Sequence, residues 1–302
     1  MIWIWVGQIV SGVLLGGYYA LLACGLSLLF GVMRIINLAH GDLAVLSAFL
    51  VWALADATGI SPFLALIAVL PVMAMVGWGL QRFMLDRSLK AGMLVPLLST
   101  FGLAIVIENL LFAQFGADTH SLAPAIGDLS YAGWTVTSQL YVGQFPALVF
   151  AVAVVLLGGL HLFLRRTQLG RAIRATAEDP DTAELVGVDS HTVHAVAAAI
   201  AVATVAIAGT FLAIRATFDP YAGPAQLIFA FEAVVIGGIG SLWGTLAGGI
   251  ILGVAQNVGA QFNSHWFLLA GHITFLAVLA LRVAAAAVSA RGGLRAILGR
   301  SG

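Results

Sequence analysis

Residues 8–31 read QIVSGVLLGGYYALLACGLSLLFG, a run without a charged side chain that ends just before Arg34, the first charged residue of the chain. A helix needs about 20 apolar residues to cross the hydrocarbon core of a bilayer, so this run is long enough to span it. The whole chain of 302 residues has the same character, because 61% of it is hydrophobic and only 9% is charged. So few charges cannot cover a soluble surface, and disorder requires low hydrophobicity. The composition therefore predicts a polytopic membrane protein.

Further uncharged stretches follow along the chain. They are residues 57–81, 93–115, 141–164, 195–214, two segments within 225–264 around a glycine-rich break at Gly237–Gly244, and 266–281. Leu43–Ala55 has only 13 residues, so we expect a broken, tilted or re-entrant helix there. The sequence predicts an all-α integral membrane protein of eight or nine transmembrane segments, organised as one domain over residues 1–302.

The positive charges predict the orientation, because cytoplasmic loops carry an excess of Lys and Arg. Twelve of the 13 Lys and Arg residues can be placed on one side, which leaves only Arg215 on the outer side. The inner groups are Arg34, Arg82/Arg87/Lys90, Arg165/Arg166/Arg171/Arg174 and Arg282/Arg291/Arg295/Arg300; the outer side also has Asp56, Asp118, Asp128 and Asp219. The C-terminus is then cytoplasmic. The N-terminus is outside if all nine segments cross and inside if the short second segment or the glycine-rich one is re-entrant, and the sequence leaves both open.

Two loops are long. Residues 117–140 form a polar external loop, and residues 165–194 form an internal loop with nine charged side chains. In the internal loop, Thr167 can cap a first helix, and Asp179-Pro180 is typical of the start of a second helix. We expect that second helix over Pro180–Val186, with Ala183 and Val186 on one side and Gly187 as its C-cap. Two capped amphipathic helices favour a docking site for a soluble partner over a merely solvated connector.

Polar residues within the membrane segments are costly and are candidates for function. The group Asn37-Leu38-Ala39-His40-Gly41-Asp42 lies between the first span and the short second one, where Gly41 permits an unusual backbone angle. A broken helix there would line a cavity, as discontinuous helices do in transporters. The alternative is an ordinary cytoplasmic turn with solvated His40 and Asp42, and the residues alone leave both open.

Two acidic residues stand in otherwise apolar segments. Glu108, followed by Asn109, and Glu232 can each line a polar cavity, pair with a basic group or be protonated; a hydrogen bond between helices is the simpler interpretation. Together they also suggest a proton relay. His161 and His272 are interpreted as packing or interface residues, and Cys24 as a buried packing residue.

Missing motifs exclude several classes of protein. The chain has no Gly-x-x-x-x-Gly-Lys-Ser/Thr phosphate loop, no HExxH and no GxSxG motif. It is therefore not expected to be an enzyme, and energy for any transport comes from a partner or an ion gradient. A net charge of zero predicts no nucleic-acid partner. Small residues spaced by four, as at Gly12 and Gly16 or Gly240 and Gly244, predict close helix packing.

Four stretches resemble the branched-chain amino acid ABC-transporter permeases, of the first-subunit type. Residues 19–42, YALLACGLSLLFGVMRIINLAHGD, are similar to the family's N-terminal signature. Residues 169–188 resemble its ATPase-coupling segment, residues 237–249 its glycine-rich C-terminal segment, and residues 98–102 its mid-chain pattern. The resemblance runs in order from Tyr19 to Leu281, but residues 117–140 do not align.

The resemblance implies an importer for branched-chain or related hydrophobic amino acids in the bacterial inner membrane. Its parts would be this chain, a second homologous permease subunit, two cytoplasmic ATP-binding subunits and an extracytoplasmic solute-binding protein. This chain would bind no cofactor, while ATP and magnesium would be bound by the ATPases. The expected path residues are Asn37, His40, Gly41, Asp42, Glu108, Asn109, Glu232, Gly237 and Gly238. The expected coupling residues are Gly170, Arg171, Arg174, Glu178, Asp179, Pro180, Asp181, Ala183 and Gly187.

Other functions stay open from the sequence. Relatives in the same family that carry urea, short amides or aromatic acids offer one alternative. An ion-coupled secondary transporter that uses Glu108 or Glu232 offers another. An intramembrane enzyme that uses His40 and Asp42 lacks a nucleophile or a third metal ligand.

Overall fold

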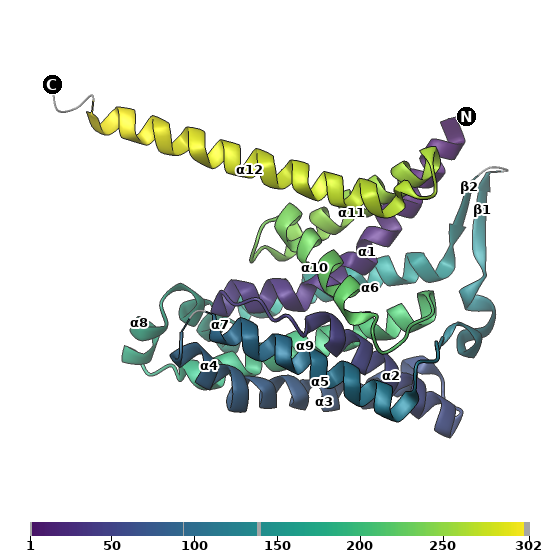
Figure 1. Ribbon diagram of the computed structural model, residues 1–302, viewed down its shortest axis with the longest axis horizontal. Helices are drawn as coiled ribbons and strands as arrows, with labels where there is room; N and C mark the ends of the chain where they lie inside the picture. Colours follow the sequence, from purple (N-terminus) through teal and green to yellow (C-terminus); the bar gives the residue numbers. More distant parts are fainter. Residues whose placement is uncertain (1, 93, 138–139, 299–302) are drawn as a thin grey trace.

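The computed structural model describes residues 2–92, 94–137 and 140–298, and these residues are mostly helical (Figure 1). The description does not include the side chains of three arginines that the charge distribution places on the cytoplasmic side, Arg291, Arg295 and Arg300. The main helices are α1 (Ile2–Met33), α2 (His40–Thr58), α3 (Pro62–Leu80), α5 (Val95–Phe115), α6 (Gln144–Arg166), α9 (Ser190–Arg215), α10 (Gly223–Gly237), α11 (Leu242–Phe262) and α12 (Trp266–Leu298). Short elements connect them: η1 (Gln81–Leu85), α4 (Asp86–Lys90), η2 (Ala123–Ser130), β1 (Gly133–Thr137), β2 (Leu140–Gly143), α7 (Gln168–Glu178) and α8 (Pro180–Leu185).

The number of spans agrees with the prediction of eight or nine. Among the described residues, 8 helices are long and apolar enough to cross a membrane, and α10 is a shorter apolar helix of 15 residues. The second segment differs in one respect from the expectation, because α2 is a continuous helix of 19 residues. The uncharged run underestimated its length, since Asp42 and Asp56 lie inside the helix near its two ends.

Helix α1 lies at the centre of the packing. It is apolar all round, as buried helices are, and it packs against α6, α9, α10 and α11. A Cβ atom added to Gly12 would stand 2.8 Å from the Gly253 carbonyl oxygen, and one on Gly16 would stand 2.7 Å from that of Gly249. The predicted close approach of small residues is therefore present, between α1 and α11 running antiparallel.

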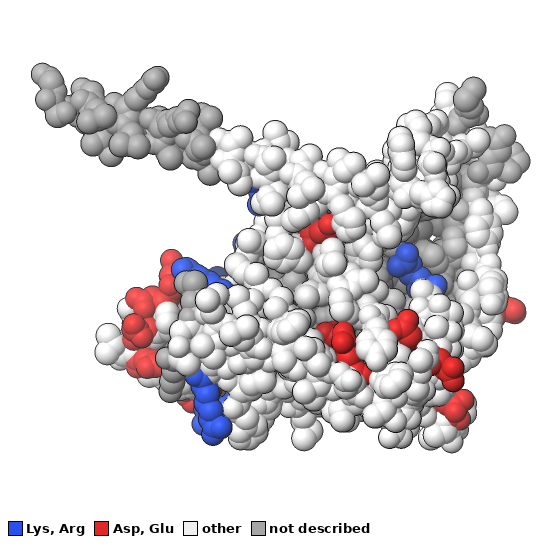
Figure 2. Space-filling view, viewed as in Figure 1, with Lys and Arg blue, Asp and Glu red and all other residues white. Residues whose placement is uncertain are grey.

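The bundle has two distinct ends. The loop end carries α7 and α8, and the hairpin end carries the antiparallel strands β1 and β2 (Figure 1). The sequence did not predict this hairpin. Its first strand lies within residues 117–140, the loop that does not align, and its second strand follows directly; the Tyr141 hydroxyl donates to the Tyr131 carbonyl beside it. Figure 2 shows charges of both signs gathered over α7 and α8 and a surface that is mostly uncharged elsewhere.

The helix directions place the start of α1 and the described C-terminal part of α12 at opposite ends of the bundle. The start of α1 lies at the hairpin end, where Gly7 approaches Leu140 of β2 and the rings of Trp5 and Phe262 are 5.3 Å apart. Helix α12 runs from that end toward the loop end, where Arg282 donates to the Ile236 carbonyl. If the loop end is cytoplasmic, as the Lys and Arg distribution predicts, α1 begins outside and α12 runs inward.

Candidate functional site

The chain between α1 and α2 passes through the interior without helical structure. It leaves α1 at Arg34 in the left-handed conformation, with φ 55°. Asn37 and His40 are both buried. The His40 Nε2 atom lies 2.7 Å from the carbonyl oxygen of Leu22. Leu22 lies about 16 Å from the end of α1, at 1.5 Å per residue, so α2 begins deep inside the bundle.

Side chains satisfy the backbone of this non-helical stretch. The Asn37 Oδ1 atom accepts a hydrogen bond from the Ala39 amide at 3.0 Å. The Leu38 amide donates to the Thr100 hydroxyl of α5 at 3.1 Å. Non-helical backbone at membrane depth requires such partners. The structure therefore agrees with one of the two interpretations of residues 37–42: they form a helix break inside the protein and not an ordinary solvated turn.

The first turn of α10 meets the first turn of α2 at this break. A Cβ atom on Gly41 would strike the Gly223 carbonyl oxygen, and one on Gly223 would strike the carboxyl group of Asp42. Both positions thus require glycine. From this contact α2 runs to the hairpin end and α10 toward the loop end, so two helix N-termini, each carrying partial positive charge, lie together inside the bundle.

Asp42 stands at this junction and is buried, with only 2% of its surface exposed. Its Oδ1 atom has no hydrogen-bond partner among the described residues. The carboxyl group of Glu108, on α5, is close enough to interact with it. The structure therefore brings two of the predicted path residues together from distant parts of the sequence.

Asn109, the neighbour of Glu108, lies on a different face of α5. It is exposed in the isolated chain, and its side-chain amide donates to the Ile105 carbonyl of the same helix at 2.8 Å. Glu108 turns toward α2 while Asn109 turns outward. Of these two predicted residues, only Glu108 joins the buried junction.

Glu232 forms the hydrogen bond between helices that was the simpler interpretation of this residue. Its Oε1 atom lies 2.5 Å from Nδ1 of His272, which joins α10 to α12. Glu232 is buried and His272 is partly exposed. His272 is thus an interface residue, as expected, while the second Glu232 oxygen has no partner among the described residues.

The glycine-rich break separates α10 from α11 with very tight packing. A Cβ atom on Gly237 would strike the Gly244 carbonyl, and the reverse clash also holds. Gly238 and Gly240 adopt φ values of 101° and 79°, which favour glycine. The Gly238 position also lies near the guanidinium group of Arg282. The break is therefore a sharp, fixed turn rather than a long loop.

The internal loop has the two capped helices that the sequence predicts. The Thr167 hydroxyl accepts from the Gly170 amide at 2.9 Å at the start of α7. The Asp179 carboxylate accepts from the Asp181 and Thr182 amides, both at 3.1 Å, at the start of α8. Gly187 follows α8 with φ 87°. The two N-caps are confirmed, whereas α8 ends one residue earlier than predicted and its C-cap is Val186 rather than Gly187.

The caps also set the charge of the loop. Hydrogen bonds from the Thr182 hydroxyl and amide hold the pKa of Asp179 below its usual range. The hydroxyl and amide of Thr192 lower the pKa of Asp189 in the same way at the start of α9. Both carboxylates are exposed and remain charged at neutral pH.

The predicted coupling residues divide into anchors and an exposed surface. Gly170 packs closely against the backbone of α6, and Ala183 is 3% exposed. The exposed ones are Arg171, Arg174, Glu178, Asp179, Pro180, Asp181 and Gly187. One expectation was wrong: Val186 does not share the buried side of Ala183 but is 76% exposed, because α8 ends at Leu185 and Val186 forms its C-cap.

A groove of about 390 Å³ connects the loop to the glycine-rich break. Its walls come from α1, α6, α7 and residues 240–243, and they include Arg165, Arg174 and His161. Helix α7 therefore faces the turn between α10 and α11 across this groove.

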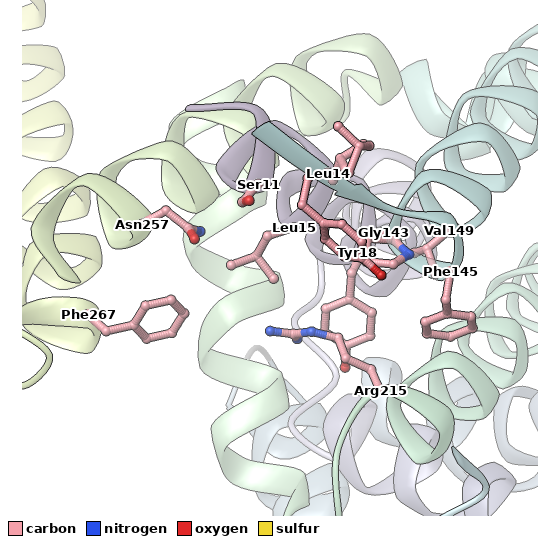
Figure 3. A pocket seen from close by; sticks show the side chains of 13 residues that line it. Ser11, Leu14, Leu15, Tyr18, Gly143, Phe145, Val149, Arg215, Asn257 and Phe267 are labelled. Carbon is pink, nitrogen blue, oxygen red and sulfur yellow. The ribbon is translucent and has the colours of Figure 1, made fainter. Parts of the chain in front are cut away.

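A second cavity, of about 210 Å³, lies toward the hairpin end and was not predicted (Figure 3). Arg215, at the end of α9, projects into it, with its guanidinium carbon 5.0 Å from the centre of the Tyr18 ring. The Tyr18 hydroxyl donates to Gln226 of α10 at 2.7 Å. The feature of the sequence that could have indicated this cavity is Arg215, the one positive charge on the predicted outer side.

Comparison with known proteins agrees with the resemblance found in the sequence. Residues 8–290 match the family model of the branched-chain amino acid transport system permease component. The chain is 30% identical over 264 residues to the high-affinity branched-chain amino acid transport system permease protein BraD of Pseudomonas aeruginosa. The alignment covers 84% of this chain and 86% of that protein.

Two further relatives have related names. The chain is 30% identical over 266 residues to the permease protein LivH of Escherichia coli, covering 85% of this chain and 86% of LivH. It is 28% identical over 241 residues to the probable permease protein LivH of Methanocaldococcus jannaschii, covering 79% of this chain and 76% of that protein. No solved structure gives a significant match.

Proposed function

The chain belongs to the family of branched-chain amino acid transport system permease components. From this membership we propose that it forms half of the translocation path of an ATP-driven importer. The proposed solutes are branched-chain or related hydrophobic amino acids, since the names of its relatives specify branched-chain amino acids for those proteins. The chain is a multi-pass membrane protein, and the bacterial inner membrane is its proposed location.

The observation that carries the proposal is the exposed helix pair α7–α8 at the loop end. Thr167 and Asp179 cap its two helices, Gly170 and Ala183 anchor them to the bundle, and the charged residues between them face outward. A rigid, charged surface of this kind suits the docking of a soluble protein. We propose that a cytoplasmic ATP-binding subunit docks there.

The junction of α2 and α10 supports a role in transport. Discontinuous helices with their N-termini inside the membrane recur where transporters bind and move solutes. Here the non-helical residues 34–39, the buried carboxyl group of Asp42 and the partly exposed carboxyl group of Glu108 lie beside that junction. We propose that these groups adjoin the path and that motion of α7 reaches the glycine-rich turn through α1 and α6, which contact both α7 and α11.

The proposed assembly has parts beyond this chain. They are a second homologous permease subunit, two ATP-binding subunits that hold ATP and magnesium, and an extracytoplasmic solute-binding protein. The ion-coupled alternative is less favoured because Glu232 is committed to His272 across the α10–α12 interface.

Co-purification tests the docking step. The chain is co-expressed with the ATP-binding proteins encoded beside it, as wild type and as the Asp179→Ala/Gly187→Ala double variant. The matched control is Gly159→Ala, on α6, where an added Cβ would meet nothing within 4 Å. Wild type and control should retain the ATPase, and the double variant should lose most of it. Absence of ATPase from the wild-type preparation would contradict the proposal.

A further inference from the structure

The cavity at the hairpin end has a chemical character that the proposed path residues do not have. Among the residues that line it, Arg215 is the one that carries a formal charge, and no Asp or Glu lines it. An isolated arginine on an apolar wall favours an anion. The cavity does not favour a cation, since it offers no carboxylate.

Arg215 is available to bind such an anion. Among the described residues it has no ion pair, and its guanidinium group rests over the Tyr18 ring instead. The ring supports one face of the planar group and leaves the N–H fork free, the geometry that matches a carboxylate with two parallel hydrogen bonds. Figure 3 shows the guanidinium group extended into the cavity.

The rest of the cavity suits a small amphipathic solute. Leu15, Phe145, Val149 and Phe267 supply apolar surface. The Asn257 amide nitrogen donates to the Gly253 carbonyl at 2.9 Å, which leaves its oxygen as an acceptor on the opposite wall. Apolar surface with a few placed polar groups is typical of small-molecule sites.

We propose that Arg215 binds the carboxylate of the transported solute at the outer mouth of the path. This inference rests on the proposed import of hydrophobic amino acids. The apolar walls take the aliphatic side chain, and the Asn257 oxygen accepts from the ammonium group. Arg215 is then a specificity-determining residue that accepts monocarboxylates and gives neutral solutes such as sugars no comparable contact.

Protection from chemical modification tests the contact directly. The assembled transporter, without the solute-binding protein, is treated with phenylglyoxal, and the modification of each arginine is followed by peptide mass spectrometry. Leucine at about ten times its dissociation constant should slow the modification of Arg215 by about tenfold, because only unoccupied sites react, while leucinamide, which lacks the carboxylate, should not. Arg87, exposed at the loop end, is the internal control. Equal protection by both compounds, or none by leucine, would overturn the inference.

Uptake by variants separates this inference from the proposed function. With all subunits present, Arg215→Gln should lower leucine uptake by about tenfold, and Arg215→Lys should restore part of it, since lysine keeps the charge but loses the fork. Arg87→Gln removes the same charge at the other end and should leave uptake unchanged. If wild type imports leucine and Arg215→Gln matches it, this inference fails alone. If wild type imports no leucine, the proposed function fails.

Discussion

The close packing of α1 against α11 allows a quantitative test. In Gly16→Ala, the new Cβ would stand 2.6 Å from the Ile250 amide nitrogen and 2.7 Å from the Gly249 carbonyl oxygen. Both contacts are backbone atoms, so no side chain can rotate away. Because carbon contacts relax to about 3.5–4.0 Å, the two helices must separate by about 1 Å.

The expected change in the free energy of unfolding is the sum of two opposing contributions. Overpacking of this kind costs about 1–3 kcal/mol, while replacing glycine by alanine within a helix gains about 1 kcal/mol. The control Gly102→Ala, on α5, has the same gain, but an added Cβ there meets nothing within 4 Å. The gain cancels between the two variants, so Gly16→Ala should be less stable than Gly102→Ala by about 1–3 kcal/mol.

The chain contains its own reporter for this measurement. Cys24, on the same helix, is its single cysteine, and it is fully buried. A fluorescent maleimide should react with it only when the bundle opens. If opening is in equilibrium, a loss of about 1–3 kcal/mol raises the labelling rate about 5- to 150-fold. Equal labelling rates for Gly16→Ala and Gly102→Ala would refute the argument that α1 and α11 require glycine at this contact.

Three further outcomes are expected. Thr167→Ala removes the N-cap of α7, which costs about 1 kcal/mol of helix stability, and should lower the uptake per ATP hydrolysed; an unchanged ratio would contradict the coupling role. Glu232→Ala should speed Cys24 labelling more than Glu232→Gln, since glutamine keeps an acceptor for His272; the reverse order would show that the pair does not stabilise the bundle. The depressed pKa values of Asp179 and Asp189 mean that their stabilising caps are complete above the ordinary Asp pKa of about 3.9 and weaken only as pH falls through the lowered values. Trypsin itself is less active at low pH, so cleavage within the internal loop is divided by that of an unfolded reference peptide at the same pH. This ratio should stay constant from about pH 8 to 5, and a rise within that range would show that these caps do not hold the loop.

Local patterns in this chain predicted local structure well. Uncharged runs of about 20 residues became helices, because the bilayer demands internally satisfied backbone over that length. Asp179-Pro180 and Gly187 marked the ends of α8, because capping depends on a few adjacent residues. Val186 was placed wrongly because the orientation of a C-cap residue depends on where the last turn ends.

Contacts between distant segments could not be predicted. The meeting of Asp42 with Glu108 and Gly223, the pairing of Glu232 with His272, and the approach of Arg215 to Tyr18 each depend on helix arrangement. The sequence singled out Asp42, Glu108 and Glu232 as costly charges but contained no signal for their partners. Tyr18 could not be predicted as the partner of Arg215, because a tyrosine in an apolar run is typical of an ordinary packing residue.

The most direct test of the central claim is uptake in proteoliposomes. The chain is reconstituted with its homologous permease partner and ATP-binding subunits, and labelled leucine is supplied with the solute-binding protein. We expect uptake that requires ATP and all of these proteins and persists when the proton gradient is collapsed. Uptake by the chain alone, driven by a proton gradient and abolished by Glu108→Gln or Glu232→Gln, would contradict it.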